Sequence, residues 1–131
     1  MKSGKIYLHN WKEDWQRAKD FLKAAEANLN LGDFKTSANR SYFTAESAVI
    51  ASLKLSSKPV SKNHKNIWEL SNLLEVGINT HDLLRELYDL RMQADYGYMS
   101  SEKILDKETV SAYLLKVKEL LNAIKKKYKL D

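Results

Sequence analysis

The amino-acid sequence contains no cysteine and little proline or glycine. Without cysteine, neither disulfide bonds nor thiolate chemistry are available to the chain, and a reducing environment is compatible with it. One proline and four glycines in 131 residues are too few for the many turns that a β protein of this size needs. The composition therefore predicts helices.

Long apolar runs are absent as well. No stretch is long enough to span a membrane, and residues 1–10 lack the continuous apolar core of a signal peptide. We therefore expect a cytoplasmic protein without membrane contact. A chain of 131 residues corresponds to one domain by length, so we expect a single domain over residues 1–131.

Acidic residues are missing from Ser47 to Trp68, although the net charge of the whole chain is only +5. This span contains the lysines Lys54, Lys58, Lys62 and Lys65 together with His64. A second basic segment closes the chain, from Lys116 onward. Such segments are compatible with nucleic-acid binding but are also common on ordinary solvated surfaces.

Apolar residues recur at steps of three and four along most of the chain, which places them on one face of a helix. Four long stripes run over residues 11–29, 34–53, 83–94 and 110–128, and a short one runs over 67–74. Joined by short links, these segments predict an all-α fold, an antiparallel four-helix up-and-down bundle with one additional short helix.

Glycine and short polar residues between the stripes predict where the helices begin and end. Glycine readily adopts the left-handed conformation that ends a helix, and Asp, Asn or Thr can accept the free N–H groups of a first turn. The glycines expected to end helices are Gly32, Gly77 and Gly97. The expected caps are Asp33, Asn79 or Thr80, and Asp106.

Metal-binding and phosphate-loop motifs are not evident. The three histidines, His9, His64 and His81, are far apart, and none has a partner at the spacing of a helical ligand pair. There is no glycine-rich phosphate loop and no nucleophile elbow. We expect neither a metal site nor a cofactor.

The segment RMQADYGY, from Arg91 to Tyr98, stands out at the end of the fourth long helix. Arg91 and Asp95 are one helical turn apart and can pair, but such a pair on a surface contributes only about 0.3–0.5 kcal/mol. Arg91 borders the apolar stripe, so we expect its guanidinium at a helix–helix seam, where it suits phosphate or carboxylate. Tyr96 and Tyr98 add rings that can stack on a base.

Three motifs in order resemble the HEPN domain, a small helical domain of prokaryotic toxin–antitoxin pairs. They are Gly32-Asp33-Phe34 followed by residues 38–43, the segment Ser61 to His64, and Arg91-Met-Gln-Ala-Asp-Tyr96. The likeness runs from about residue 12 to residue 128. It implies a bundle that dimerises, often with a minimal nucleotidyltransferase antitoxin as partner. Several branches of the family are metal-independent RNases with an arginine, four to six residues and then a histidine.

The chain departs from that RNase pattern at its key position. In such an RNase a histidine transfers the proton of the 2′-hydroxyl, while an arginine stabilises the negative charge of the phosphorane. Here the spacing after Arg91 reaches Tyr96, and tyrosine, with a pKa of about 10, is a poor base at pH 7. His64 belongs to another helix, and the sequence does not place it relative to Arg91. Enzyme activity therefore stays open.

The leading hypothesis is a HEPN-type toxin, or a partner component of a nucleotidyltransferase pair, that binds RNA or a nucleotide and for which metal-independent RNase activity stays open, with Arg91, Asp95 and Tyr96 as the candidate catalytic residues. Arg91 would hold phosphate, Asp95 would orient Arg91, and Tyr96 would donate or stack. The further binding candidates are Arg40, which could hold a second phosphate, and Asn39, His64, Lys62, Lys65 and Tyr98. The alternatives are a non-enzymatic homodimeric scaffold with the RMQADY segment at its dimer interface, and a nucleotide-binding regulator.

Overall fold

A computed structural model describes residues 11–58, 60, 63–97 and 105–131 of the chain. Within these ranges the chain is helical throughout, with turns between the helices and no strand. The helices are α2 (Trp11–Asn30), α3 (Phe34–Leu55), α4 (His64–Ser71), the 3-10 turn η1 (Asn72–Leu74), α5 (Thr80–Tyr96) and α6 (Lys107–Tyr128). The expected all-α fold is confirmed.

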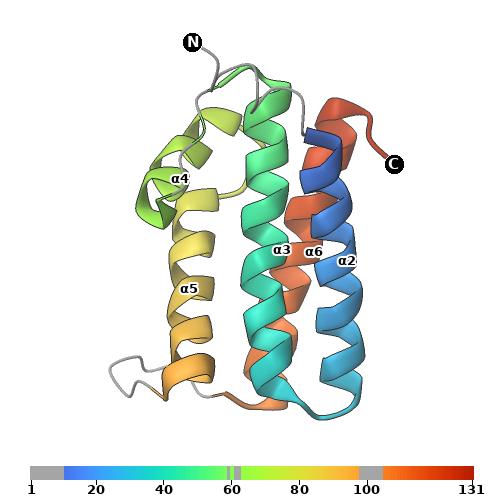
Figure 1. The fold of residues 1–131 in the computed structure, drawn as a ribbon, viewed down its shortest axis with the longest axis vertical. Helices are drawn as coiled ribbons and strands as arrows, with labels where there is room; N and C mark the ends of the chain where they lie inside the picture. The colour runs from blue at the N-terminus through green and yellow to red at the C-terminus, as the bar shows by residue number, and fades with distance from the viewer. Residues whose placement is uncertain (1–10, 59, 61–62, 98–104) are drawn as a thin grey trace.

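The four long helices pack side by side, and successive long helices run in opposite directions (Figure 1). The short α4 lies at one end of the bundle, next to the start of α5 (Figure 1). The predicted antiparallel four-helix up-and-down bundle with one additional short helix is therefore confirmed. No helix in the described part of the chain is long and apolar enough to cross a membrane.

Helix α3 occupies the centre of the bundle, because it contacts α2, α4, α5 and α6. Its buried surface consists largely of small side chains, which let the neighbouring helices approach closely. These buried small residues are Ser37, Ala38, Ser41, Ala45, Ser47, Ala48, Ala51 and Ser52. Larger side chains from the other helices, such as Leu87 and Ile124, complete the core around α3.

A buried ion pair joins α2 to α3. Lys54 Nζ donates to Asp14 Oδ2 at 2.6 Å, and both side chains are buried. Asp14 also accepts from Arg17 Nη1 at 3.1 Å. The pair fixes α2 against the second half of α3, because a charge left alone in this place would be costly.

Most of the expected helix ends are present. Gly32 has a φ of +82° after α2, and the Asp33 side chain accepts from the Thr36 N–H at 3.1 Å. Asn79, rather than Thr80, caps α5, accepting from the Asp82 N–H at 3.1 Å. Asp106 caps α6, and the backbone N–H of Gly97 closes α5 on the Gln93 carbonyl at 2.9 Å.

The expectation that Gly77 ends the short helix is wrong. That helix tightens into η1, and Glu75 takes the left-handed conformation with a φ of 49°. Side chains from elsewhere satisfy the carbonyls at this end: Thr80 Oγ1 donates to the Ser71 carbonyl at 3.0 Å, and Lys127 Nζ donates to the Leu74 carbonyl. Because these tertiary contacts replace a glycine cap, the helix can end before Gly77.

Candidate functional site

Polar residues of α3 and α5 meet at the seam between the two helices. Arg91 Nε on α5 donates to Asp95 Oδ2 at 3.2 Å. Asn39 on α3 reaches the same carboxylate, with its Nδ2 lying 3.0 Å from Asp95 Oδ2 and 3.3 Å from Oδ1. Arg40 Nη1 in turn donates to Asn39 Oδ1. The structure thus brings together four residues that the sequence places on two separate segments.

Aromatic rings surround the Arg91 guanidinium. Its Cζ atom lies 4.7 Å from the ring centre of Phe43, 5.6 Å from that of Tyr88 and 5.8 Å from that of Tyr42. The side chain is only 16% exposed. Among the described residues Arg91 hydrogen-bonds through Nε alone, so its two terminal nitrogens keep donors for an anion.

A second cluster lies where α4 begins against α3. His64, the first residue of α4, has Nδ1 2.5 Å from Glu46 Oε2 and 3.0 Å from the Tyr42 hydroxyl. The Tyr42 hydroxyl donates to Glu46 Oε2 at 2.5 Å and accepts from Trp68 Nε1 at 3.2 Å. Glu46 is therefore a buried carboxylate held by a histidine and a tyrosine.

Burial, followed by the negative charge of Glu46, raises the pKa of Tyr42 well above its usual value. The phenol is therefore neutral at physiological pH and acts as a hydrogen-bond donor. With Tyr42 donating to Glu46, the short contact between Glu46 and His64 requires a proton on His64 Nδ1. Nδ1–H is thus the tautomer that satisfies every partner when the ring is neutral.

Tyr88 connects the two clusters. Its ring centre lies 5.2 Å from the ring centre of His64 and 5.6 Å from the Cζ atom of Arg91. Tyr42 also contacts both groups, at 5.7 Å and 5.8 Å. Arg91 on α5 and His64 on α4 therefore border the same pair of rings, although they are far apart in the sequence.

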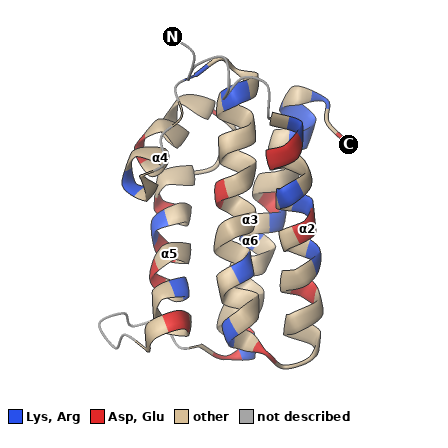
Figure 2. Cartoon of the chain, in the orientation of Figure 1, with Lys and Arg blue, Asp and Glu red and all other residues tan. Residues whose placement is uncertain are grey.

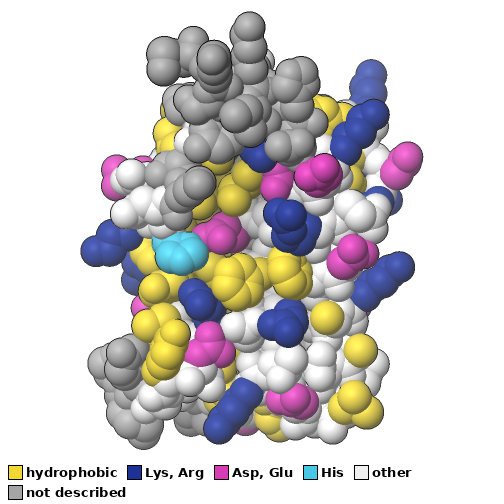
Figure 3. Space-filling model, viewed as in Figure 1, with side chains coloured by type: hydrophobic (Ala, Val, Ile, Leu, Met, Phe, Trp, Pro, Cys, Tyr) yellow, Lys and Arg dark blue, Asp and Glu magenta, His cyan; other side chains and the backbone are white. Residues whose placement is uncertain are grey.

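A hollow of about 380 Å³ opens beside this cluster, lined by Asn63, His64, Lys65, Trp68 and Tyr88. Figure 3 shows a histidine on this side of the molecule, bordered by hydrophobic and acidic side chains with lysine or arginine close by. The surface here combines aromatic rings, a titratable imidazole and cations. That combination suits a ligand with both a base and a phosphate.

The remaining predicted residues lie at the edges of this region. Lys65 is exposed next to His64 on α4. Tyr96 is the last residue of α5, and its side chain is exposed. Lys62 and Tyr98 lie outside the described residues.

The sequence reasoning missed Glu46, together with the structural roles of Tyr42, Tyr88 and Trp68. Glu46 is the one acidic residue within α3, and it stands one turn after Tyr42 on the buried face. An acidic residue within an alanine- and serine-rich buried face is the signal that could have revealed it, because an isolated buried carboxylate is costly.

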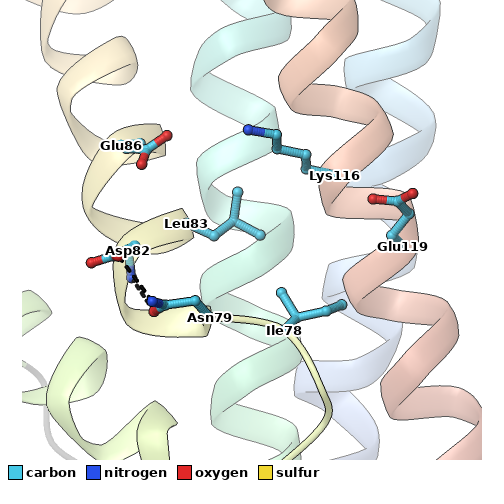
Figure 4. Close-up of a pocket in the computed structure, with 7 residues that line it drawn as sticks. All are labelled: Ile78, Asn79, Asp82, Leu83, Glu86, Lys116 and Glu119. Carbon is cyan, nitrogen blue, oxygen red and sulfur yellow. Dashed lines mark hydrogen bonds between the residues drawn. The ribbon is translucent and has the colours of Figure 1, made fainter.

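A different hollow lies between α5 and α6, also about 380 Å³ in volume (Figure 4). It is lined by Ile78, Asn79, Asp82, Leu83, Glu86, Lys116 and Glu119. Its three carboxylates against one lysine make it unsuitable for a phosphate ligand. It also contains none of the residues that the sequence singled out as binding candidates.

Within the described ranges, no group of three or more His, Cys, Asp or Glu side chains is arranged to hold a metal ion. The model of one protein family, described as the HEPN domain, matches residues 11–127, which is nearly the whole chain. No curated protein matches the chain. The matched range contains both the α3–α5 seam and the His64 cluster.

Proposed function

The chain belongs to the HEPN domain family, and on this premise we propose that it binds the phosphate of RNA or of a nucleotide through Arg91. The protein would be a toxin, or the toxin-like partner, of a pair with a minimal nucleotidyltransferase. It would act as a homodimer, with residues 1–131 forming one domain. RNA is the ligand that the surroundings of Arg91 favour.

The observation that carries this proposal is the way Arg91 is held. Asp95 binds its Nε, Asn39 fixes that carboxylate from α3, and Phe43 supports the guanidinium plane. A guanidinium with its terminal nitrogens available is well suited to a phosphate, which accepts two parallel hydrogen bonds from the fork. Holding the side chain in advance lowers the entropy lost on binding.

Neighbouring side chains support RNA over a small anion. Arg40 lies next to Asn39 in the same network and can hold a second phosphate. Lys65 and Tyr88 line the hollow beside His64, where a base can stack and a cation can approach the backbone. We propose that Tyr96, at the end of α5, adds a further ring or hydroxyl for the ligand.

The test compares RNA retention by the wild type, Arg91→Ala and Arg85→Ala. Arg85 lies on the same helix but is 48% exposed and contacts Asp82 loosely at 3.7 Å, so it is a matched control. We expect Arg91→Ala to lower RNA affinity at least 10-fold, because a charge-assisted hydrogen bond contributes roughly 1.5–3 kcal/mol. Arg85→Ala should change it little. Unfolding curves of both variants verify the fold.

If both variants retain RNA like the wild type, the Arg91 site is refuted. If the wild type itself retains no RNA but forms a dimer, the protein is better described as a scaffold. Tight binding of a mononucleotide without RNA retention would instead support a nucleotide-binding regulator. In cells, loss of toxicity in Arg91→Ala but not in Arg85→Ala would support the toxin role.

A further inference from the structure

We propose that a hollow between the start of α2 and the residues that follow α6 binds a small anion that carries an aromatic ring. The acidic group of this ligand is a carboxylate or a phosphate ester. Trp15 lies in the lining, and we call this space the Trp15 hollow. It shares no lining residue with the α3–α5 seam or the His64 cluster, so the inference does not depend on the proposed RNA site.

Two helix ends form the Trp15 hollow. The first turns of α2 lie beside the end of α6 and the residues that follow it (Figure 1). The volume is about 360 Å³, within the range of roughly 300–1,000 Å³ that is typical of small-molecule sites. Trp11, Trp15 and Leu130 supply the apolar part of the lining. Such a space accommodates one aromatic ring with one charged group.

Trp15 has an unsatisfied hydrogen-bond donor. The residue is only 6% exposed, and its indole Nε1 is buried without a hydrogen-bond partner. Most buried polar groups are hydrogen-bonded, and a buried donor without an acceptor is costly. Trp68 shows the usual situation, because its Nε1 donates to the Tyr42 hydroxyl at 3.2 Å. Since Trp15 lines the hollow, we infer that a ligand there supplies the missing acceptor.

The charges around the hollow favour an anion. Lys12, Lys19 and Lys129 line it, against the single carboxylate side chain of Asp131. Within the described part of the chain, none of these three lysines is engaged in an ion pair, so their ammonium groups are available to a ligand. The hollow between α5 and α6 has the reverse balance, with three carboxylates against one lysine. An excess of positive charge raises the local concentration of anions.

Trp11 places an aromatic ring beside these charges. It is partly buried against the core, and Lys12 Nζ lies 5.7 Å from its ring centre. An anion held by Lys12 therefore has the Trp11 ring within reach. Contacts between aromatic rings contribute more than the area they bury. A ligand with its own ring can use both Lys12 and Trp11, whereas an inorganic anion can use only the charge.

An ionised oxygen is the acceptor that suits both kinds of donor in the hollow. A hydrogen bond to a charged acceptor is roughly twice as strong as one between neutral groups, which favours it at the indole N–H of Trp15. The same oxygen, or a second one on the same acid, can pair with Lys19, which is half-buried. Carboxylates and phosphate esters both provide two such oxygens. A cationic ligand would leave Nε1 without an acceptor and would be repelled by the lysines.

The first test is calorimetric titration of the whole protein with four probes in a low-salt buffer free of phosphate. The probes are phenyl phosphate, benzoate, inorganic phosphate and benzylamine. We expect at least one of the two aromatic anions to bind, and phenyl phosphate to bind about 5-fold more tightly than inorganic phosphate if the site prefers phosphate esters. Benzylamine, which has the ring but a positive charge, should not bind.

The second test follows the indole N–H signals by NMR of protein with nitrogen-labelled tryptophan. The chain has three tryptophans, so the signals are few, and Trp68 is an internal reference because its N–H already has a partner. Adding the aromatic anion should move the Trp15 signal downfield, as expected when this N–H gains an acceptor. The Trp68 signal should stay in place.

Three variants locate the binding. Trp15→Phe keeps a ring but removes the donor, and should weaken binding at least roughly 10-fold. Lys19→Ala should weaken it about 5-fold, because Lys19 is partly accessible to solvent. Lys23→Ala is the matched control, since Lys23 lies one turn further along α2, is exposed and does not line the hollow. Asp131→Asn should strengthen binding, because it removes the opposing carboxylate.

The possible results are decisive in either direction. Binding of benzoate or phenyl phosphate that shifts the Trp15 signal and weakens in Lys19→Ala, but not in Lys23→Ala, supports the site, and the tighter probe identifies its acid. No binding of either anion, equal binding of benzylamine, or binding that leaves the Trp15 signal unmoved overturns it. If Trp15→Phe fails to fold, the signal of the wild type and the two lysine variants still decide. RNA retention through Arg91 is unaffected by any of these outcomes.

Discussion

Arg91 differs from an ordinary surface arginine in the number of independent contacts that hold it. The i,i+4 pair with Asp95 alone would contribute only about 0.3–0.5 kcal/mol to the stability of the helix. Packing on Phe43 adds a cation–π contact of about 0.5–2 kcal/mol, and Asn39 ties the pair to a second helix. The guanidinium is therefore positioned before any ligand arrives.

Tyr42 gives a prediction at high pH. Burial and Glu46 raise its pKa, so the folded protein keeps this phenol protonated at a pH where the unfolded chain has lost the proton. The unfolded state then binds fewer protons than the native state, and the free energy of unfolding should fall as pH rises above about 10. Below that pH this phenol should cause no pH dependence.

Urea unfolding of the wild type and Tyr42→Phe between pH 8 and about 12 measures this effect. The variant should be less stable at neutral pH, because Glu46 and Trp68 lose a partner, but its stability should decline less steeply above pH 10. Tyr113, whose pKa burial and Glu86 also raise, contributes equally to both proteins. Parallel declines would contradict the buried, neutral state of Tyr42.

At the residue scale, the sequence predicted contacts within a helix better than contacts between helices. The spacing of Arg91 and Asp95 was enough to expect their pairing, since one helical turn separates them. The contact of Asn39 with Asp95, and that of His64 with Glu46, depend on how α3 packs against α5 and α4. Periodicity along one helix carries no information on that packing.

At the scale of helices, the bundle was predictable because each long helix has its own apolar stripe, and α3, α5 and α6 each begin after a capping residue. Asp33 and Asp106 cap α3 and α6 through bonds to residues three positions on, which is a purely local pattern. The end of the short helix was not predictable in this way. Thr80 and Lys127 satisfy its carbonyls from other parts of the fold, so a local signal such as Gly77 could not locate it.

The ion pair between α2 and α3 gives the prediction at this scale. Lys54→Met leaves Asp14 buried with Arg17 as its remaining cation, and should lower the free energy of unfolding by about 3 kcal/mol. The double variant Asp14→Leu with Lys54→Met removes both charges. It should be clearly more stable than Lys54→Met alone, as measured by urea unfolding. Equal stability of the single and double variants would contradict a cost from the unpaired carboxylate.

The net charge is modest, and charges of both signs are mixed along two of the four long helices (Figure 2). Lys or Arg and Asp or Glu alternate along α2 and α5 (Figure 2), although the net charge is +5. A bundle of this kind attracts RNA only weakly through its overall field, so tight binding requires a local site. In the proposed function, Arg91 and its network provide such a site.

The most direct measurement of the central claim is RNA affinity over a series of salt concentrations for the wild type, Arg91→Ala and Arg85→Ala. If Arg91 holds a phosphate, Arg91→Ala should bind RNA at least 10-fold more weakly, and its slope of log affinity against log salt should be shallower by about 0.7, one counterion release on single-stranded RNA. Arg85→Ala should keep the affinity and slope of the wild type. Equal losses in both variants, or no loss in either, would contradict a specific phosphate site at Arg91.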